Sequence, residues 1–263
     1  MTAASPGAMK KQPTLVLGAV PWEISPICVA LQKRKSSTIH DFPYWTGTID
    51  GEPVVVAITG VGKTNAAMIS TLFIDRFRPK RLIFTGTAAR VNRALNTGDI
   101  ILSKKVVHHD FGSMQAGGML YRKSIGAVKG RPVNFQYFAD AALLKSAVAA
   151  AKTFPPRNVT ANGKTYVPAI RPGIICAGDV FGMTEAKLAD IRNKIGADLV
   201  EMEGSAVGQV CFEMHVPFLV IRGGSNFAQE NPGGDYKRLG NIAARSAALF
   251  TVHFVRELAR AKA

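Results

Sequence analysis

The chain has 263 residues, with 33 Lys and Arg against 18 Asp and Glu, a formal net charge of +15 and 47% hydrophobic residues. A chain of this length and apolar content can bury a large core, which excludes a disordered or low-complexity polymer. No run of residues approaches the roughly 18 consecutive apolar positions of a transmembrane helix, so we expect no membrane partner.

The excess of positive charge raises the question of a nucleic-acid partner. Basic residues cluster at 33–35, 76–81 and 104–105, mostly at the expected ends of helices or strands, where cations complement helix C-termini or are solvated. No segment resembles a recognition helix, an aromatic RNA-binding strand or a zinc finger. The sequence therefore predicts a basic surface without specific nucleic-acid binding.

Three cysteines, Cys28, Cys176 and Cys211, lie far apart between apolar neighbours. Their number is odd and they form no CxxC pair, so the sequence indicates neither a disulfide framework nor a zinc site. We expect three small core residues. Reduced cysteines are typical of a cytoplasmic protein.

Apolar runs and helical patterns alternate along the chain. In chain order we expect a strand at 14–20, a helix at 22–33, a hairpin over 44–60 that turns at Asp50-Gly51, a helix at 64–77, strands at 81–86 and 99–107, a loop at 111–135, a helix at 139–152, a loop at 154–172, a strand at 173–178, a helix at 184–195, a strand at 198–202, a helix at 204–214, a strand at 217–224 and a helix at 236–261.

This alternation predicts a single-domain α/β fold over residues 14–263, with a central mixed, mostly parallel sheet flanked by helices. Residues 1–13 are expected to form a flexible N-terminal extension. Ligands bind such sheets beyond the carboxyl ends of the strands. We therefore look for chemistry in the loops that follow them, at 18–23, 59–63, 86–90, 178–182, 201–205 and 222–227.

Two motifs suggest chemistry that the sequence does not support. Gly62-Lys63-Thr64 opens a helix after a strand, like the end of a phosphate-binding P-loop, but the motif's first glycine is replaced by Ala57 inside the strand. What remains is a corner whose backbone N–H groups could meet an oxygen-rich ligand.

His108-His109-Asp110 could suggest a metal site. However, neighbouring side chains on a strand point to opposite faces, so we expect a surface or interface role and no metal.

Three acidic residues carry a stronger signal. Glu201 and Glu203 stand where a buried strand ends and a helix begins, and Glu23 lies between two apolar runs just after the first strand. A helix N-terminus stabilises carboxylates, which is one explanation for the first two. A charge placed among apolar residues needs a partner or a function.

At this point the sequence resembles a known family. The segment LVEMEGSAVGQVCFEMHVPFLVIRGGSN, which starts at Leu199, is similar to the signature region of the nucleoside phosphorylase/nucleosidase superfamily, in its 5'-methylthioadenosine/S-adenosylhomocysteine nucleosidase branch. GAVPWEI, ITGVGKTNAA, FTGTAARVNRALNTGDIILS and CAGDVFGM add matches along residues 14–258. The resemblance implies a nucleoside phosphorylase-like fold, a homodimer, and hydrolysis of the N-ribosidic bond of a purine nucleoside without cofactor or metal.

The resemblance also implies roles for individual residues. Glu23 would activate the attacking water, and Glu203 would hold the ribose hydroxyls with Met202 against the sugar. Phe181 would stack on the purine. The remaining substrate-binding positions would be Thr87, Ala88, Glu201 and Ser225.

The chemistry of the reaction agrees with these residue types. Cleavage of a ribosyl C–N bond passes through a state with positive charge on the sugar. Carboxylates such as Glu23 and Glu203 stabilise that charge better than they stabilise the neutral substrate.

The sequence departs from the family pattern at the base. The family has a Ser-Asp pair whose aspartate protonates the purine, whereas this chain has Ser225-Asn226. We place Asn226 in the catalytic pair with Glu23, but an amide cannot transfer a proton. Asn226 therefore either shifts the substrate preference toward 6-oxopurines or marks a nucleoside-binding relative with little or no turnover. Gly182 replaces a larger apolar residue and predicts a wider base pocket.

A purine nucleoside phosphorylase is a further alternative. Arg90 stands where the family has glycine, and an arginine near the sugar loop could bind phosphate. A surface or interface position for Arg90 is the other interpretation.

Overall fold

The computed structural model describes residues 11–228 and 232–261, so residues 1–10 of the expected N-terminal extension lie outside the described residues. The strands are β1 Thr14–Gly18, β2 Gln32–Ile39, β3 Phe42–Ile49, β4 Glu52–Ile58, β5 Arg81–Arg90, β6 Ile100–His108, β7 Ser113–Gln115, β8 Gly118–Leu120, β9 Gln136–Phe138, β10 Val159–Ala161, β11 Lys164–Tyr166, β12 Ile170–Ala177, β13 Leu199–Glu201 and β14 Phe218–Phe227. The helices are α1 Pro21–Ala30, α2 Lys63–Phe77, α3 Ala141–Thr153, α4 Glu185–Ile195, α5 Gly204–Glu213 and α6 Pro232–Arg260.

One large sheet organises the chain, in the order β13-β12-β6-β14-β5-β1-β4-β3-β2. Parallel pairings form two blocks, β4-β1-β5-β14 and β6-β12-β13, and antiparallel pairings join them. β13 also pairs with β5, which closes five strands into a ring. The predicted α/β class with a mixed central sheet is confirmed.

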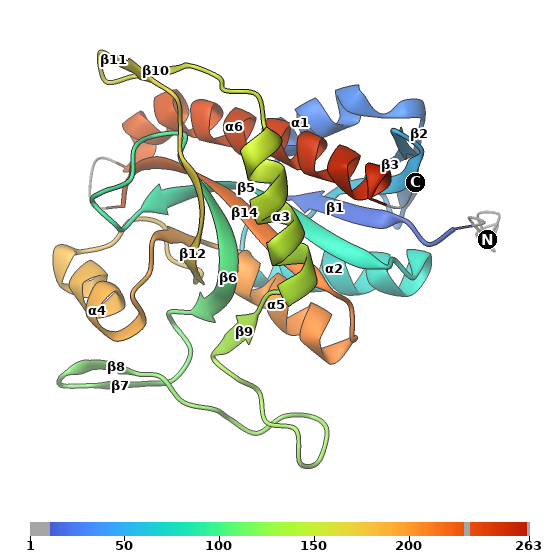
Figure 1. Ribbon diagram of the computed structural model, residues 1–263. Helices are drawn as coiled ribbons and strands as arrows, with labels where there is room; N and C mark the ends of the chain where they lie inside the picture. The colour runs from blue at the N-terminus through green and yellow to red at the C-terminus, as the bar shows by residue number, and fades with distance from the viewer. Residues whose placement is uncertain (1–10, 229–231, 262–263) are drawn as a thin grey trace.

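Helices cover both faces of the sheet (Figure 1). α1, α3 and α6 pack on one face, around a cluster that includes Ile27, Ala147 and Phe254. α2 and α5 pack on the other, around Phe73 and Val207. The long helix α6 shows why such a segment forms: small and apolar residues recur every three or four positions and are buried as one stripe along β14. Among the described residues, no helix is both long and apolar enough to cross a bilayer.

Three elements differ from the sequence-based expectation. The helix expected at 22–33 ends at Ala30, because residues 32–39 form β2, an antiparallel partner of β3. β2 is almost entirely exposed and lacks alternating apolar residues, so its sequence carried no strand signal. The loops expected at 111–135 and 154–172 contain the short hairpins β7–β8 and β10–β11.

Strand β5 extends past its expected end at residue 86 and positions part of the site. Thr87 and Ala88 continue the pairing with β14, opposite Gly223 and Gly224. Ala89 then pairs with Val200 of β13. Thr87 and Ala88 are therefore held in place by their pairing with β14.

Candidate active site

The carboxyl ends of five strands meet at one edge of the sheet. β1 leads into α1, β4 into α2 and β13 into α5, while the ends of β5 and β14 lie between them. These segments carry Glu23, Thr87, Glu203 and Asn226, all of which are buried. The sequence placed the site at this edge, and the structure brings these side chains together there.

Glu23 is fixed by hydrogen bonds to both carboxylate oxygens. It lies in the first turn of α1, after Pro21 at the helix start. Its Oε2 accepts from the backbone N–H of Ala19 at 2.8 Å, and its Oε1 accepts from the backbone N–H of Thr87 at 2.7 Å and from the Thr87 hydroxyl at 3.2 Å. With so many donors around it, Glu23 is stabilised as an acceptor with a defined orientation.

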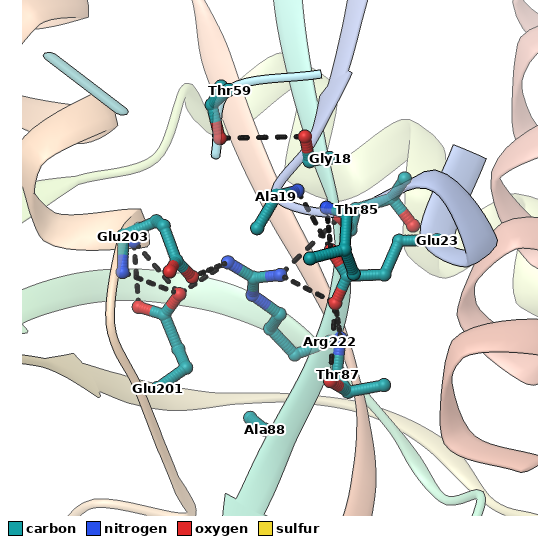
Figure 2. Close-up of polar contacts among 12 residues, drawn as sticks. Gly18, Ala19, Glu23, Thr59, Thr85, Thr87, Ala88, Glu201, Glu203 and Arg222 are labelled. Atoms are coloured by element: carbon teal, nitrogen blue, oxygen red, sulfur yellow. Dashed lines mark hydrogen bonds and ion pairs between the residues drawn. The ribbon is translucent and has the colours of Figure 1, made fainter. Parts of the chain in front are cut away.

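Arg222 of β14 lies at the centre of the acidic residues, with no exposed surface (Figure 2). Its Nη2 pairs with Oε2 of Glu201 and lies 3.1 Å from Oε2 of Glu203, while Nη1 is 3.7 Å from Oε1 of Glu23. The guanidinium carbon also lies 4.4 Å from the centre of the Phe84 ring. One buried cation therefore connects three carboxylates from two segments, the start of α1 and the junction between β13 and α5.

Besides sharing Arg222, the carboxylates of Glu201 and Glu203 accept hydrogen bonds from different backbone N–H groups. Glu201 accepts from the backbone N–H groups of Glu203 and Gly204 at the start of α5. Glu203 instead accepts at Oε1 from the N–H of Gly62, 2.9 Å away, at the start of α2. The oxygen-rich ligand expected for the glycine corner at 60–62 is thus a carboxylate of the protein itself.

The electrostatics differ between these groups. Burial and the neighbouring Glu201 raise the pKa of Glu203 to about 8, although Arg222 opposes the shift. Burial alone would lower the pKa of Arg222, but the glutamates around it raise it. Arg222 therefore stays charged, and the charge of Glu203 changes near pH 8.

A cavity of about 250 Å³ opens beside these acids. Every residue that we proposed for the site from the sequence lines this cavity, together with small and apolar neighbours. Its lining comprises Ala19, Val20, Trp22, Glu23, Val61, Thr87, Ala88, Ala89, Val180, Phe181, Gly182, Met183, Val200, Glu201, Met202, Glu203, Ser225, Asn226 and Ala228. Phe181 is 57% exposed and Trp22 45% exposed, so both aromatic side chains lie partly at the surface of the pocket. Gly182 follows with φ of +79°, a conformation that favours glycine.

Asn226 lies in the wall of this cavity and is 3% exposed. Its Nδ2 donates to the carbonyl of Phe227 at 2.9 Å, and its Oδ1 is 3.1 Å from the hydroxyl of Ser225. That hydroxyl also lies 3.0 Å from the carbonyl of Ala88. The amide is held in place by β14 and β5 rather than projecting freely into the cavity.

A closed ring of hydrogen bonds holds the segment that carries Phe181. The ammonium of Lys63 pairs with Oδ1 of Asp110 at 2.6 Å, and Oδ2 of Asp110 accepts from the N–H of Asp179 at 3.1 Å. Oδ1 of Asp179 in turn accepts from the backbone N–H of Lys63 at 2.7 Å. We call Lys63, Asp110 and Asp179 the loop clasp, because Phe181 follows Asp179 by two residues.

Two expectations from the sequence are wrong. Arg90 is buried, not at a surface: its Nη1 donates to the carbonyl of Leu95 at 2.7 Å and its guanidinium lies over Phe227. His108 and His109 are also buried, and Nδ1 of His108 lies 2.8 Å from the hydroxyl of Ser205 on α5. Burial lowers the pKa of both imidazoles to about 4, so both are neutral at pH 7. Among the described residues, no group of three or more His, Cys, Asp or Glu side chains could hold a metal ion.

Sequence reasoning missed Arg222. The signal was present, because an arginine inside the apolar strand segment LVIRGG has to be paired when the strand is buried. The three cysteines are free and buried, as expected.

Comparison with known proteins agrees with this architecture. The family described as the phosphorylase superfamily matches residues 13–256. A 5'-methylthioadenosine/S-adenosylhomocysteine nucleosidase of Anoxybacillus flavithermus is 33% identical over 245 residues, which cover 92% of this chain and 97% of that protein. A second such nucleosidase, from a Geobacillus species, is 32% identical over 92% of this chain and 97% of its own length.

Solved structures show the same similarity. The nucleosidase of this name from Neisseria meningitidis, crystallised with methylthio-immucillin-A, superimposes with a TM-score of 0.79 at 28% identity, covering 94% of this chain and 99% of that one. The Colwellia psychrerythraea nucleosidase in complex with adenine also gives 0.79, at 26% identity, covering 95% and 96%. The chain therefore belongs to the phosphorylase superfamily, in its 5'-methylthioadenosine/S-adenosylhomocysteine nucleosidase branch.

Proposed function

We propose that this protein is a purine nucleosidase, which uses water to cleave the bond between a purine and its ribose. The observation that carries the proposal is that Glu23 and Glu203, fixed on either side of Arg222, line one cavity with Phe181 and Asn226. Its relatives, which are named as nucleosidases, support the same reaction.

In this mechanism Glu23 orients and deprotonates the attacking water. Its carboxylate is already held by the N–H groups of Ala19 and Thr87, so it can take a proton without reorienting. Glu203 binds the ribose hydroxyls, with Met202 against the sugar. As the C–N bond breaks, positive charge develops on the ribose, and these fixed carboxylates stabilise it more than they stabilise the neutral substrate.

The other lining residues position the nucleoside. Phe181 stacks on the base, and Thr87 and Ala88 form the strand wall of the pocket. Glu201 holds Arg222, and Ser225 holds the amide of Asn226, which faces the base. No cofactor or metal takes part in the proposed reaction.

Phosphorolysis is less well supported. Arg90, the candidate phosphate ligand from the sequence, contacts Leu95 and Phe227 instead. Among the described residues that line the cavity, none is a lysine or an arginine.

We also propose that the protein is a cytoplasmic homodimer. Light scattering in solution tests the dimer, and a mass of one chain would reject it.

The test of the function is a panel of purine nucleosides incubated with and without phosphate, following release of free base. The proposal predicts release that does not depend on phosphate. Release that requires phosphate would identify a phosphorylase, whereas binding without release from any nucleoside would identify a nucleoside-binding protein.

A further inference from the structure

The cavity offers no group placed to protonate a departing base. Among its described lining residues, the side chains that ionise are Glu23, Glu201 and Glu203. Each of the three accepts hydrogen bonds at both carboxylate oxygens: Glu23 from α1 and β5 backbone, Glu201 from the start of α5 and Arg222, and Glu203 from the start of α2 and Arg222. All three are therefore anchored around the guanidinium, on the sugar side of the proposed reaction.

The residue on the base side cannot replace an acid. Asn226 has an amide in place of a carboxyl group, and its Nδ2 and Oδ1 already contact Phe227 and Ser225. An amide nitrogen has no proton to give at neutral pH. A neutral purine, which leaves readily only after it gains a proton, thus receives no such help here.

The same cavity is well suited to a positively charged ring. Three glutamates surround the single charge of Arg222, so the formal charge of the site stays negative even when Glu203 holds its proton. The partly exposed rings of Trp22 and Phe181 line its mouth, and aromatic faces attract cations. A base that enters with its own positive charge would find both features.

We infer that the preferred substrates are ribosides whose base already carries a positive charge, such as N7-alkylated purine ribosides; this inference rests on the proposed function. As the bond between C1' and N9 breaks, its electron pair goes to the ring, and the base leaves as a neutral 7-alkylpurine. The water oxygen bonds to C1', and one water proton goes to the Glu23 carboxylate and then to solvent. No proton has to reach the base, which is the step that Asn226 cannot supply.

The experiment compares adenosine with 7-methyladenosine at pH 6, in the wild-type protein and in Asn226→Asp. Base release gives kcat/KM for each, after subtraction of the uncatalysed rate. 7-Methylation also weakens the bond between C1' and N9 without any enzyme. We therefore compare the ratio of kcat/KM for 7-methyladenosine to kcat/KM for adenosine between the wild-type protein and Asn226→Asp. Asn226→Ala is the matched control, since it removes the amide without adding an acid.

We expect the wild-type protein to prefer 7-methyladenosine at least about a hundredfold, the size of a general-acid contribution. Asn226→Asp should raise cleavage of adenosine by a similar factor and reduce the ratio accordingly, whereas Asn226→Ala should keep the wild-type ratio. Cleavage of adenosine by the wild-type protein as fast as 7-methyladenosine would overturn the inference and leave the proposed function standing. So would equal ratios in wild type and Asn226→Asp. Release of base from neither substrate by any of the three proteins would overturn the proposed function and the inference with it.

Discussion

Arg222 and Glu23 face each other in the interior, with Nη1 of the guanidinium 3.7 Å from Oε1 of the carboxylate and both side chains almost fully enclosed. They come from β14 and α1, at opposite ends of the fold's element order, and 199 positions (222 − 23) separate them. Their contact links the proposed water-activating group to the cation that also neutralises Glu201 and Glu203.

Replacing Arg222 with glutamine should destabilise the fold strongly. Three carboxylates would lose their shared counter-charge, and removal of one partner from a buried ion pair typically costs about 3–5 kcal/mol. Chemical denaturation gives the free energy of unfolding. The control is Arg171→Gln: this side chain is 41% exposed and pairs with Asp198, so its loss should cost less than about 1 kcal/mol. Equal effects of the two substitutions would show that Arg222 is not the centre of the cluster.

Gly86 tests how closely the backbone approaches this ion pair. A Cβ at this position would lie 1.9 Å from Nη1 of Arg222 and 2.4 Å from Oε1 of Glu23, so Gly86→Ala must displace one of them. We expect lower stability and a fall in kcat/KM of at least about tenfold, which corresponds to 1.4 kcal/mol. Gly117→Ala is the matched control, because a Cβ there meets nothing within 4 Å. If Gly86→Ala behaves like Gly117→Ala, the arrangement around Arg222 is wrong.

Glu23→Gln separates catalysis from binding. Glutamine keeps the size of the side chain and an acceptor for the N–H of Thr87, but it cannot take a proton from water. Turnover of 5'-methylthioadenosine or 7-methyladenosine should fall by about a hundredfold or more, while calorimetry should show nearly unchanged affinity. Glu185→Gln changes an exposed acid outside the cavity and should leave both unchanged. Full turnover by Glu23→Gln would remove this residue from the mechanism.

The raised pKa of Glu203 predicts how activity depends on pH. In the free protein this carboxyl group holds a proton below about pH 8, and the neutral form stabilises a positively charged sugar less well. A plot of log kcat/KM should therefore rise with pH and level off near 8. Glu203→Gln should remove this inflection. A wild-type profile that stays flat from pH 6 to pH 9 would contradict the assignment.

The same shift affects stability with a definite sign. Because the pKa is raised from 4.5 to about 8 in the folded state, the folded protein binds more protons than the unfolded chain within that range. The free energy of unfolding should then fall as pH rises through it. Comparing denaturation of wild type and Glu203→Gln at pH 5 and pH 8 isolates this contribution, since only the wild type can show it at this residue.

The loop clasp predicts a change in substrate affinity. Asp110→Asn removes the ion pair with Lys63 and presents an amide to the ammonium, so the segment from Asp179 to Phe181 should lose its fixed position. KM should rise severalfold with a smaller change in kcat, because the acids on the sugar side are untouched. Asp75→Asn, an exposed acid paired with Arg78, is the control. If Asp110→Asn instead lowers kcat and leaves KM unchanged, the clasp does not position Phe181.

Much of this site could be predicted from local sequence. Glu23 and Glu203 follow strands whose apolar runs are easy to recognise, and Asn226 lies near the end of a third. The α/β rule places the ends of such strands together. The same reasoning failed for Arg90 and His109, because whether a polar residue at a strand end is buried depends on what packs over it. Strand β2 was missed since it is exposed and polar, and its pairing with β3 leaves no periodic pattern.

The long-range contacts could not be predicted at all. The N–H of Gly62 binds Glu203 across 141 positions, and Lys63 meets Asp110 across 47. No pattern within either segment records its partner. These contacts convert two ordinary loop ends into one rigid site.

In the proposed reaction water attacks C1' of the nucleoside in this cavity, and transfer of an oxygen isotope shows directly whether it does. Nucleoside is hydrolysed by the wild-type protein in water labelled with heavy oxygen, and the released sugar is analysed by mass spectrometry. We expect free ribose, or its 5'-substituted form, with one labelled oxygen at C1' and an equimolar amount of free base. A sugar 1-phosphate, or base release that stops when phosphate is removed, would contradict it.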